Sequence, residues 1–562
     1  MRSKKINKPM LIVGMMLTVL PIAAGAVDAP YSATGAPDAG VLLNELEPGR
    51  HVTPRPAKPV IDNKMPVAKT VQQDVKAHVS KVIFECSELD VNERLQPVAA
   101  DKIHRDMSFA DMQALADAAT AALRQEGYMT AVAYVPSQDL SGNVLKVKVI
   151  IGRYGDVYLS NKSSLMNSRL VGYTQAIRPG QLINDRSLNK ALLILNDIPG
   201  MSVKASMEPG TKAGTAKLYI QAADLERQGG YVYADNYGNK STGKTRFGFD
   251  YHFNNLSHVG DQLDAAFLTS TKVMRNYQLR YNLPVGRDGA MSRIAFSHMN
   301  YKLGDRYEYL NGDGLANTLE IGVSVPMKRT LENSSFYDIA YRHRSLRDGL
   351  FDSELLSKKS SDSVELEIHG YQRQERDSLS YSLGHLVGKI SMDNAWAKAQ
   401  DAVLQTAGWY NKSMGSFYYI NQLNDRWQLH LSVSGQYGWN NLDSSEDFYI
   451  GGADAVRAFP QGETGGDSGL LGTLEFRYRT SIDGLTLTAF VDGGRVFYNH
   501  DTTGMDGDNG RNLAGVGLGL IYNKSRDWYA KFDWATPWGP HYSTTNGENV
   551  HNTCWLRVVK QF

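Results

Sequence analysis

The sequence predicts a membrane all-β fold, a closed antiparallel β-barrel that follows two small α+β modules. An export signal opens the chain, and no later segment offers the roughly 18 or more uninterrupted apolar residues of a membrane helix. Aromatic residues and glycine are abundant, with 30 Tyr, 17 Phe, 8 Trp and 52 Gly. From Gly229 to Phe562, apolar and polar residues alternate with a period of two. Strands with one side toward lipid and the other toward water have this pattern.

Residues 1–26 have the organisation of a secretory signal peptide. Four basic residues and no acid precede the apolar stretch Met10–Leu20, and Ala24-Gly25-Ala26 supplies the small residues that a signal peptidase recognises. We expect cleavage before Val27. The mature chain would then carry 56 Lys and Arg against 59 Asp and Glu. Because nucleic-acid binding needs a basic domain or stripe, we expect no nucleic-acid partner.

The 2 cysteines of the chain indicate no metal site. Cys86 follows Val82 and Phe84 on one side of an expected strand, which predicts a buried thiol. Cys554 lies in the last strand, in a different expected domain, so we expect no disulfide between the two. Cysteines without neighbouring histidines cannot form a structural zinc site. We therefore expect no metal, no cofactor and no catalytic residue, although serines and histidines on a barrel rim leave a hydrolase open.

Residues 27–76 are expected to form a tether that contains one short helix. Asp38 can cap a helix over residues 38–47, and Pro48-Gly49 ends it. The apolar side of this helix consists of Val41, Leu42, Leu43 and Leu46. Further prolines follow, and we expect them to keep the rest of the tether extended and unpacked.

Residues 77–152 are expected to form a small α+β module. A strand at Val82–Cys86 precedes a helix that begins at Ser108, where Asp111 completes a capping box. Two strands follow, at Ala131–Val135 and Val144–Ile151. Residues 153–228 repeat this order, with a helix around 188–195 that is broken at 197–200 and strands around 203–207 and 216–222. The chain therefore contains a tandem repeat of one module.

Residues 229–562 are expected to form the barrel itself. Phe247, Phe249, Tyr251 and Phe253, for example, alternate with polar residues and glycine. At about 9–11 residues for each tilted strand, plus turns, this segment accommodates about 16 strands, an even number. Gly515-x-Gly517-x-Gly519 is similar to a nucleotide-binding fingerprint, but no helix follows it, and close packing of strands is the expected explanation.

A long glycine-rich loop, residues 441–469, interrupts the barrel strands. Its core reads Val456-Arg457-Ala458-Phe459 and is preceded by Gly451-Gly452. The next strand carries Phe490-Val491-Asp492-Gly493-Gly494.

These segments resemble the outer-membrane transporters of two-partner secretion systems, which are relatives of the barrel-assembly insertases. The loop core is similar to the family's Val-Arg-Gly-Phe/Tyr motif, and Phe490, Asp492 and Gly494 match its Phe-x-Asp-x-Gly element. The tandem modules resemble the family's two POTRA domains, with Gly127-Tyr128 and 133–138 matching the signature of the first. The helix at 38–47 resembles the pore-plugging helix. The departure is Ala458 in place of Gly; alanine disfavours a positive φ, which allows a differently wound loop tip.

The resemblance implies a function and a set of partners. The barrel would lie in outer-membrane lipid, with both POTRA domains in the periplasm, and it would export a large exoprotein that has an N-terminal secretion domain. That cargo would be an adhesin, a cytolysin or a contact-dependent growth-inhibition toxin, with the toxin favoured. Periplasmic chaperones and the barrel-assembly machinery would assist its biogenesis. Arg457 would pair with Asp492 in a bidentate bridge that holds the loop inside the barrel.

Two other functions fit parts of the pattern. A barrel-protein insertase shares the loop but usually has more POTRA modules. A general porin needs neither the modules nor the plug helix, and an outer-membrane protease or lipase fits least.

Overall fold

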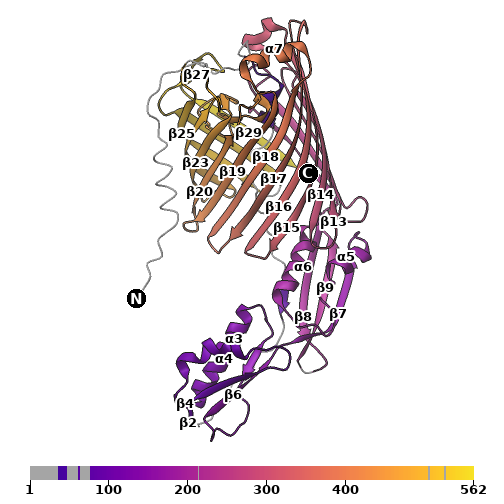
Figure 1. Cartoon of the computed structure of the whole chain (residues 1–562), viewed down its shortest axis with the longest axis vertical. Coiled ribbons are helices and arrows are strands. Elements are labelled where there is room, and N and C mark those ends of the chain that lie inside the picture. The colour runs from indigo at the N-terminus through magenta and orange to yellow at the C-terminus, as the bar shows by residue number, and fades with distance from the viewer. Residues whose placement is uncertain (1–35, 47–60, 64–75, 213, 504–506, 525–526) are drawn as a thin grey trace.

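The computed structural model describes residues 36–46, 61–63, 76–212, 214–503, 507–524 and 527–562. These residues form a tall barrel with two small domains below it (Figure 1). The expected signal peptide and the prolines that follow the expected helix at 38–47 lie outside the described residues. None of the helices in the described ranges has the length and apolar character needed to cross a membrane.

The barrel is closed and antiparallel, which confirms the predicted fold class and strand number. Its 16 strands pair in chain order, and the last pairs with the first. β15, β16 and β17 are 17, 18 and 19 residues long, so they extend beyond the ~9–11 residues that span a bilayer. The strands are β10 (Gln228–Asp235), β11 (Arg246–Asn254), β12 (Gln262–Ser270), β13 (Arg275–Val285), β14 (Ala290–Lys302), β15 (Asp313–Arg329), β16 (Asn333–Leu350), β17 (Leu355–Arg373), β18 (Asp377–Met392), β19 (Gly408–Gln422), β20 (Trp427–Gly438), β23 (Ser468–Arg479), β24 (Leu485–Phe497), β25 (Arg511–Lys524), β26 (Trp528–Pro537) and β29 (Thr553–Gln561).

The expected alternation of faces is present along the strands. On β11, Phe247 and Phe249 are exposed on the outer surface, while Gly248 between them faces the ring of Tyr233. On β17, Val364 and Leu366 are exposed and Glu365 between them is buried. Apolar side chains therefore face outward, toward lipid, and polar side chains face the lumen.

A carboxylate reinforces the closure of the barrel. β10 pairs with β29 from Tyr231↔Gln561 to Asp235↔Arg557. Asp235 accepts hydrogen bonds from Arg246 on β11 and from Arg557 on β29, each at 2.8 Å for the shortest contact. One buried acid thus joins three adjacent strands across the closure.

The first small domain is a three-stranded sheet covered by two helices. The sheet order is β3-β6-β5, and a separate pair, β2 with β4, lies beside it. The capping box at Ser108 is confirmed: Asp111 N donates to Ser108 Oγ at 3.1 Å, and Ser108 N donates to Asp111 Oδ2 at 2.9 Å. α3, β2 and β4 were not predicted from the sequence. The elements are β2 (Lys76–Val79), β3 (Lys81–Glu85), α3 (Asn92–Ala99), β4 (Arg105–Ser108), α4 (Phe109–Gln125), β5 (Val132–Tyr134) and β6 (Val144–Ile150).

The second small domain contains a strand from the tether. Its own elements are β7 (Arg153–Lys162), α5 (Asn167–Tyr173), α6 (Asp185–Asp197), β8 (Met201–Pro209) and β9 (Thr215–Asp224). β1 (Ile61–Asn63) pairs in parallel with Ala205–Met207, which gives the sheet order β1-β8-β9-β7. The expectation of an unpacked tether is therefore wrong for these residues, because the free edge of β8 offers backbone partners to any extended segment.

Candidate functional site in the barrel lumen

The loop between β20 and β23, residues 439–467, folds into the barrel, and we call it the lumen loop. It contains a short hairpin of β21 (Phe448–Ile450) and β22 (Thr464–Gly466). Gly451 and Gly452 follow β21 with φ values of +108° and +121°, a backbone region that favours glycine. These two glycines turn the chain into the segment that carries Arg457.

Arg457 and Asp492 lie together, as the bidentate pairing requires. Arg457 Nε donates to Asp492 Oδ2 and Nη2 donates to Oδ1, both at 2.9 Å. The backbone N of Arg457 donates to the same carboxylate at 3.1 Å. The guanidinium also lies over the ring of Phe490, 3.2 Å from its centroid. Arg457 is 4% exposed and Asp492 is 1% exposed, so the pair is shielded from water.

Two further acids contact Arg457, and neither was expected from the sequence. Arg457 Nη1 donates to Glu475 at 2.8 Å and lies 3.6 Å from Asp533. Arg477 pairs with Glu475 at 2.7 Å, and Lys531 pairs with Asp533 at 2.9 Å. Glu475 on β23 and Asp533 on β26 stand at polar positions of the alternating pattern, so the sequence indicates that they face the lumen. Only the register between the strands shows that they converge on Arg457.

The residues that flank Arg457 are fully buried. Val456, Ala458 and Phe459 are each 0% exposed, and they pack with Ile450 and Phe490. Two side chains of β29 donate hydrogen bonds to the backbone of this segment. Trp555 Nε1 donates to Arg457 O at 2.7 Å, and Thr553 Oγ1 donates to Ala458 O at 2.9 Å.

Glycines on the barrel wall make room for this anchor. A Cβ at Gly515 would lie 2.4 Å from Cβ of Ala458, and one at Gly517 would lie 2.3 Å from Cζ of Phe490. A Cβ at Gly494 would likewise lie 3.3 Å from the side chain of Ile450 in the lumen loop. Close packing with the neighbouring strands β24 and β26 explains Gly517 and Gly519, as expected, whereas Gly515 makes room for the lumen loop. Ala458 itself is not among the described residues with a left-handed backbone.

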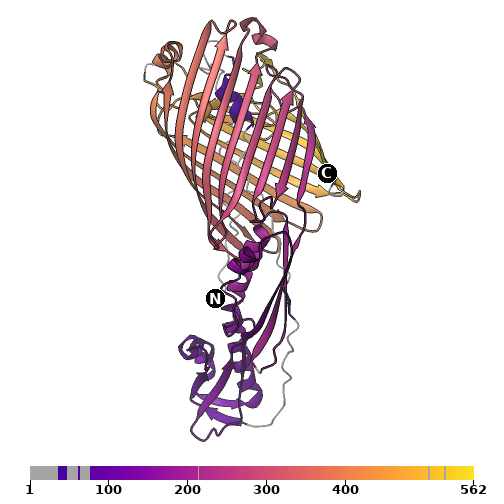
Figure 2. The same cartoon turned by 90° about the vertical axis from the view of Figure 1, so that its right-hand side faces the viewer.

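The helix expected at 38–47 is α2 (Ala39–Leu46), and it lies inside the barrel (Figure 2). Asp38 caps it by accepting from Val41 N at 3.0 Å. The backbone N of Ala39 donates to Asp348 on the barrel wall at 2.7 Å. Its side chains Val41, Leu42 and Leu43 are buried and Leu46 is partly buried; Leu42 and Leu43 belong to a cluster with Met299, Tyr301 and Leu346.

α2 rests directly on the lumen loop. A Cβ at Gly40 would lie 2.6 Å from Ser445 N and 2.7 Å from Ser444 Oγ. Ser444 Oγ donates to Asp38 at 2.7 Å, and Asn44 donates to Ser444 O at 3.0 Å. Helix and loop are therefore in backbone contact, which only a residue without a side chain allows at position 40.

The base of the lumen loop is bonded to the barrel wall. Glu446, which is 1% exposed, pairs with Arg344 at 2.8 Å and with Lys412 at 2.9 Å. Lys359 pairs with Asp443 at 2.6 Å. The loop is thus fixed at its base and again at Arg457.

The second small domain contacts the lower rim of the barrel through an arginine. Arg329, at the end of β15, donates from Nη2 and Nε to Asp197 at the end of α6, at 2.6 and 2.8 Å. Ser334 and Tyr371 accept from the same guanidinium at 2.7 and 2.6 Å. Beside this joint, Lys190 lies 3.6 Å from Asp288 at an exposed contact.

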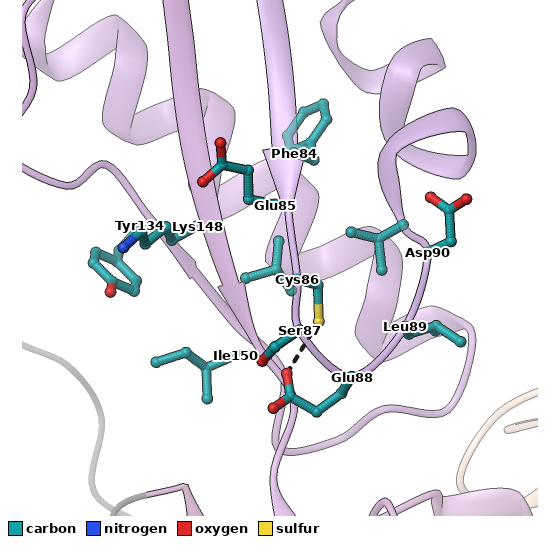
Figure 3. Close-up of a pocket in the computed structure, with 12 residues that line it drawn as sticks. Phe84, Glu85, Cys86, Ser87, Glu88, Leu89, Asp90, Tyr134, Lys148 and Ile150 are labelled. Atoms are coloured by element: carbon teal, nitrogen blue, oxygen red, sulfur yellow. Dashed lines mark hydrogen bonds between the residues drawn. The ribbon is translucent and has the colours of Figure 1, made fainter.

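The first small domain carries a hollow of about 760 Å³ at the end of β3 (Figure 3). Cys86 lies just past β3 and is partly exposed, so the prediction of a buried thiol is wrong in degree. Its Sγ donates to Glu88 at 3.4 Å. Burial raises the pKa of the Cys86 thiol, and a hydrogen bond from Ser87 lowers the pKa of Glu88. A thiol with a raised pKa is a weak nucleophile at neutral pH.

Gln138 explains part of the signature segment at 133–138. β5 ends at Tyr134, and Pro136 has no N–H with which to continue the sheet. The side chain of Gln138 makes the hydrogen bonds to β6 that a strand backbone would make. Lys146 N donates to Gln138 Oε1 at 2.8 Å, and Gln138 Nε2 donates to Lys146 O at 2.7 Å. The amide therefore substitutes for a strand backbone.

Comparison with known proteins gives matches along nearly the whole chain. The family described as haemolysin secretion/activation protein ShlB/FhaC/HecB matches residues 214–522, and the ShlB-type POTRA domain matches residues 77–152. The heme/hemopexin transporter protein HuxB of Haemophilus influenzae (strain 86-028NP) is 26% identical, with 94% of this chain and 96% of that protein covered. The outer membrane transporter CdiB of Dickeya dadantii (strain 3937) is 24% identical, with 70% of this chain and 71% of that protein covered.

Among solved structures, CdiB from Escherichia coli has the same fold. It superimposes with a TM-score of 0.72 at 20% identity, and 89% of this chain and 93% of that chain are covered. The family match extends over more than half of the 562 residues. The chain belongs to the haemolysin secretion/activation protein family ShlB/FhaC/HecB and is an outer-membrane transporter of the two-partner secretion type, with its POTRA domains in the periplasm.

Proposed function

We propose that α2 and the lumen loop together close the pore through which this transporter exports its exoprotein. The supporting observation is that both occupy the lumen and are bonded to each other and to the wall through Asp38, Ser444 and Arg457. An extended polypeptide needs a continuous path, so both must move before cargo passes. Arg457 and Asp492 then act as the lock of the loop, and α2 acts as the plug.

The cargo is a large exoprotein with an N-terminal secretion domain. The similarity to HuxB, named a heme/hemopexin transporter, extends over more of the chain than the similarity to CdiB. That difference favours a heme- or hemopexin-binding exoprotein over the growth-inhibition toxin that was expected from the sequence. Periplasmic chaperones and the barrel-assembly machinery would serve the biogenesis of the barrel. We propose no catalytic role for any residue.

The test is export of a candidate exoprotein by cells that produce this chain. An exoprotein gene of each class is expressed with the chain and, separately, without it. Cargo at the cell surface or in the medium only when the chain is present supports the proposal. Retention of every cargo in the periplasm, with the barrel correctly inserted, contradicts it. Improved insertion of other barrel proteins instead would favour the insertase.

A further inference from the structure

The outer surface of the barrel changes from apolar to polar along β16 and β17. Nearer the periplasm, its exposed residues are Tyr337, Ile339 and Tyr341 on β16 and Val364, Leu366 and Ile368 on β17. Every second side chain of a strand shares a face, and the register between these two strands is continuous. The same outward face therefore continues toward the cell surface with polar residues, which are His343, Ser345 and Arg347 on β16 and Asp362, Ser360 and Lys358 on β17.

Arg347 and Lys358 lie at the level where the outer leaflet of the membrane ends. β16 begins at the periplasmic rim, where Ser334 accepts a hydrogen bond from Arg329. α7 (Ala395–Leu404), in the connection between β18 and β19, marks the opposite end of the barrel (Figure 1). A tilted strand crosses a bilayer in about 9–11 residues, and counting that many from Tyr337 ends at residues 345–347. Lipid headgroups of the outer leaflet therefore meet the barrel at this pair.

The two cations face each other without a counter-charge. Arg347 and Lys358 are directly opposite across the two strands. The Cβ atoms of such a pair lie about 4.5–5.5 Å apart, and like charges in this position destabilise a sheet. Within the part of the chain that the structure describes, neither side chain forms an ion pair or a hydrogen bond. The pair thus lacks the anion that would offset its repulsion.

The acids around the pair have other partners. Asp313, on the neighbouring β15, accepts a hydrogen bond from Ser353 at 3.4 Å. Asp393, which follows β18, accepts one from Ser360 at 3.1 Å. An anion from outside the chain is therefore needed to neutralise Arg347 and Lys358.

The surface on the periplasmic side of the pair also suits a polar neighbour. Asp362 accepts a hydrogen bond from the hydroxyl of Tyr341 at 2.5 Å and lies 2.9 Å from His343 Nδ1. Ser345 and Ser360 are directly opposite each other between these residues and the two cations. Hydrocarbon offers polar groups no hydrogen-bond partners. Sugar hydroxyls match this part of the surface better than acyl chains do.

We propose that Arg347 and Lys358 bind a phosphate group of a phosphorylated glycolipid in the outer leaflet, with its sugar hydroxyls against Ser345 and Ser360. A phosphate presents several acceptor oxygens, so it can pair with both cations at once, and arginine binds it with two parallel N–H groups. The occupant is a lipid because both side chains point away from the lumen at the headgroup level. The site is independent of the proposed gate, since it lies on the other side of the barrel wall.

Microscale thermophoresis of the full chain, in non-ionic detergent without divalent cations, tests binding. The probe is lipopolysaccharide truncated to lipid A and its innermost sugars. We expect saturable binding, weakened roughly tenfold or more by the double change Arg347→Gln and Lys358→Gln, and weakened likewise when the probe is dephosphorylated. The matched control is Lys328→Gln with Arg373→Gln, which removes two cations from the periplasmic ends of β15 and β17 and should bind as wild type. The heat-dependent gel shift of the barrel verifies that each variant is folded.

Three outcomes would contradict the site. Equal affinity of all three proteins overturns it, and an equal loss in the control pair overturns it as well, because binding would then follow net charge alone. Undiminished binding of the dephosphorylated probe would exclude phosphate recognition. Inorganic phosphate at the concentration of the probe should not displace it, and displacement would show a site for free anions instead of a lipid.

Discussion

The anchor of the lumen loop is a buried cluster in which the charges balance. Three acids face three bases in it: Asp492, Glu475 and Asp533 against Arg457, Arg477 and Lys531. Removing one partner from a buried ion pair costs about 3–5 kcal/mol because the other charge stays buried. The guanidinium of Arg457 contacts three carboxylates at once, which makes it the most sensitive member of the cluster.

In Arg457→Ala the lumen loop loses its defined position and lies unanchored in the pore, so export should fall roughly tenfold or more. Asp492→Ala should cost somewhat less, because Arg457 then retains Glu475 and Asp533. The double variant should be no worse than Arg457→Ala. Arg457→Lys should recover little, since a single ammonium lacks the paired donors. Secreted exoprotein at matched barrel levels is the readout, and losses that multiply would mean that the two residues act independently.

Gly515 and Ala458 form a complementary pair. A methyl group at Gly515 would overlap that of Ala458 at 2.4 Å, and overpacking of this kind costs about 1–3 kcal/mol. We expect Gly515→Ala to weaken the anchor and reduce export, and Ala458→Gly in the same chain to restore it. Gly493→Ala is the control, because its Cβ meets nothing within 4 Å. Equal export by Gly515→Ala and wild type, or no rescue, would show that the contact is unimportant.

The sequence identified half of this anchor. Arg457 and Asp492 stand in motifs that local pattern and family resemblance make visible. Glu475, Asp533 and Gly515 are unremarkable in sequence, and their convergence depends on the register of β23, β25 and β26. A shift by one residue would turn each of them to the other face of the sheet.

Among whole elements, the contact of α2 with the lumen loop is the least foreseeable from sequence. An isolated eight-residue helix is unstable in water, so α2 depends on its surroundings. Helix propensity alone disfavours glycine at position 40. Glycine is needed there because a Cβ atom would lie 2.6 Å from the backbone N of Ser445. Local patterns, by contrast, predicted the capped α4, α6 and the alternating strands, because each carries its own period.

Gly40→Ala gives opposite predictions for the isolated helix and for the seated one. Alanine stabilises a helix by about 1 kcal/mol over glycine, yet its methyl would collide with Ser444 and Ser445. We expect the variant to leave the lumen more often, with a higher open probability in planar bilayers. A chain without residues 28–47 defines the unplugged level, and Gly493→Ala is again the control. An open probability equal to or below that of wild type would mean that α2 is not seated through Gly40.

Over the whole molecule, the periplasmic part contacts one side of the barrel rim. Ser164 and Met166 contact the β11–β12 turn, Lys190 the β13–β14 turn, and Asp197 the end of β15. The tether adds β1 to the sheet of the same domain, so the segment that leads to α2 is attached there as well. The contacts with the barrel rim and the pairing of β1 with β8 could not be predicted from the sequence, since both join segments that are far apart in the chain.

The two partners of the Arg329–Asp197 ion pair should differ in how much stability is lost when each is removed. The side chain of Arg329 is 5% exposed and that of Asp197 is 45% exposed. Asp197→Ala leaves a buried guanidinium with only two hydroxyl partners, at a cost of about 3–5 kcal/mol. Arg329→Ala leaves a half-exposed carboxylate that water can solvate, which costs about 0–1 kcal/mol. We expect both variants to loosen the second small domain, but Asp197→Ala to lower the thermal stability more.

Limited trypsin digestion after Arg227, an exposed residue just before β10, measures the loosening, and calorimetry measures the stability. Both variants should be cut faster than wild type. Asp288→Ala is the control, because its contact with Lys190 in the same interface is exposed and contributes little. Unchanged cleavage in both variants would show that the domain is held without this joint. A larger loss of stability in Arg329→Ala would show that Arg329 finds solvent at the barrel rim once Asp197 is gone.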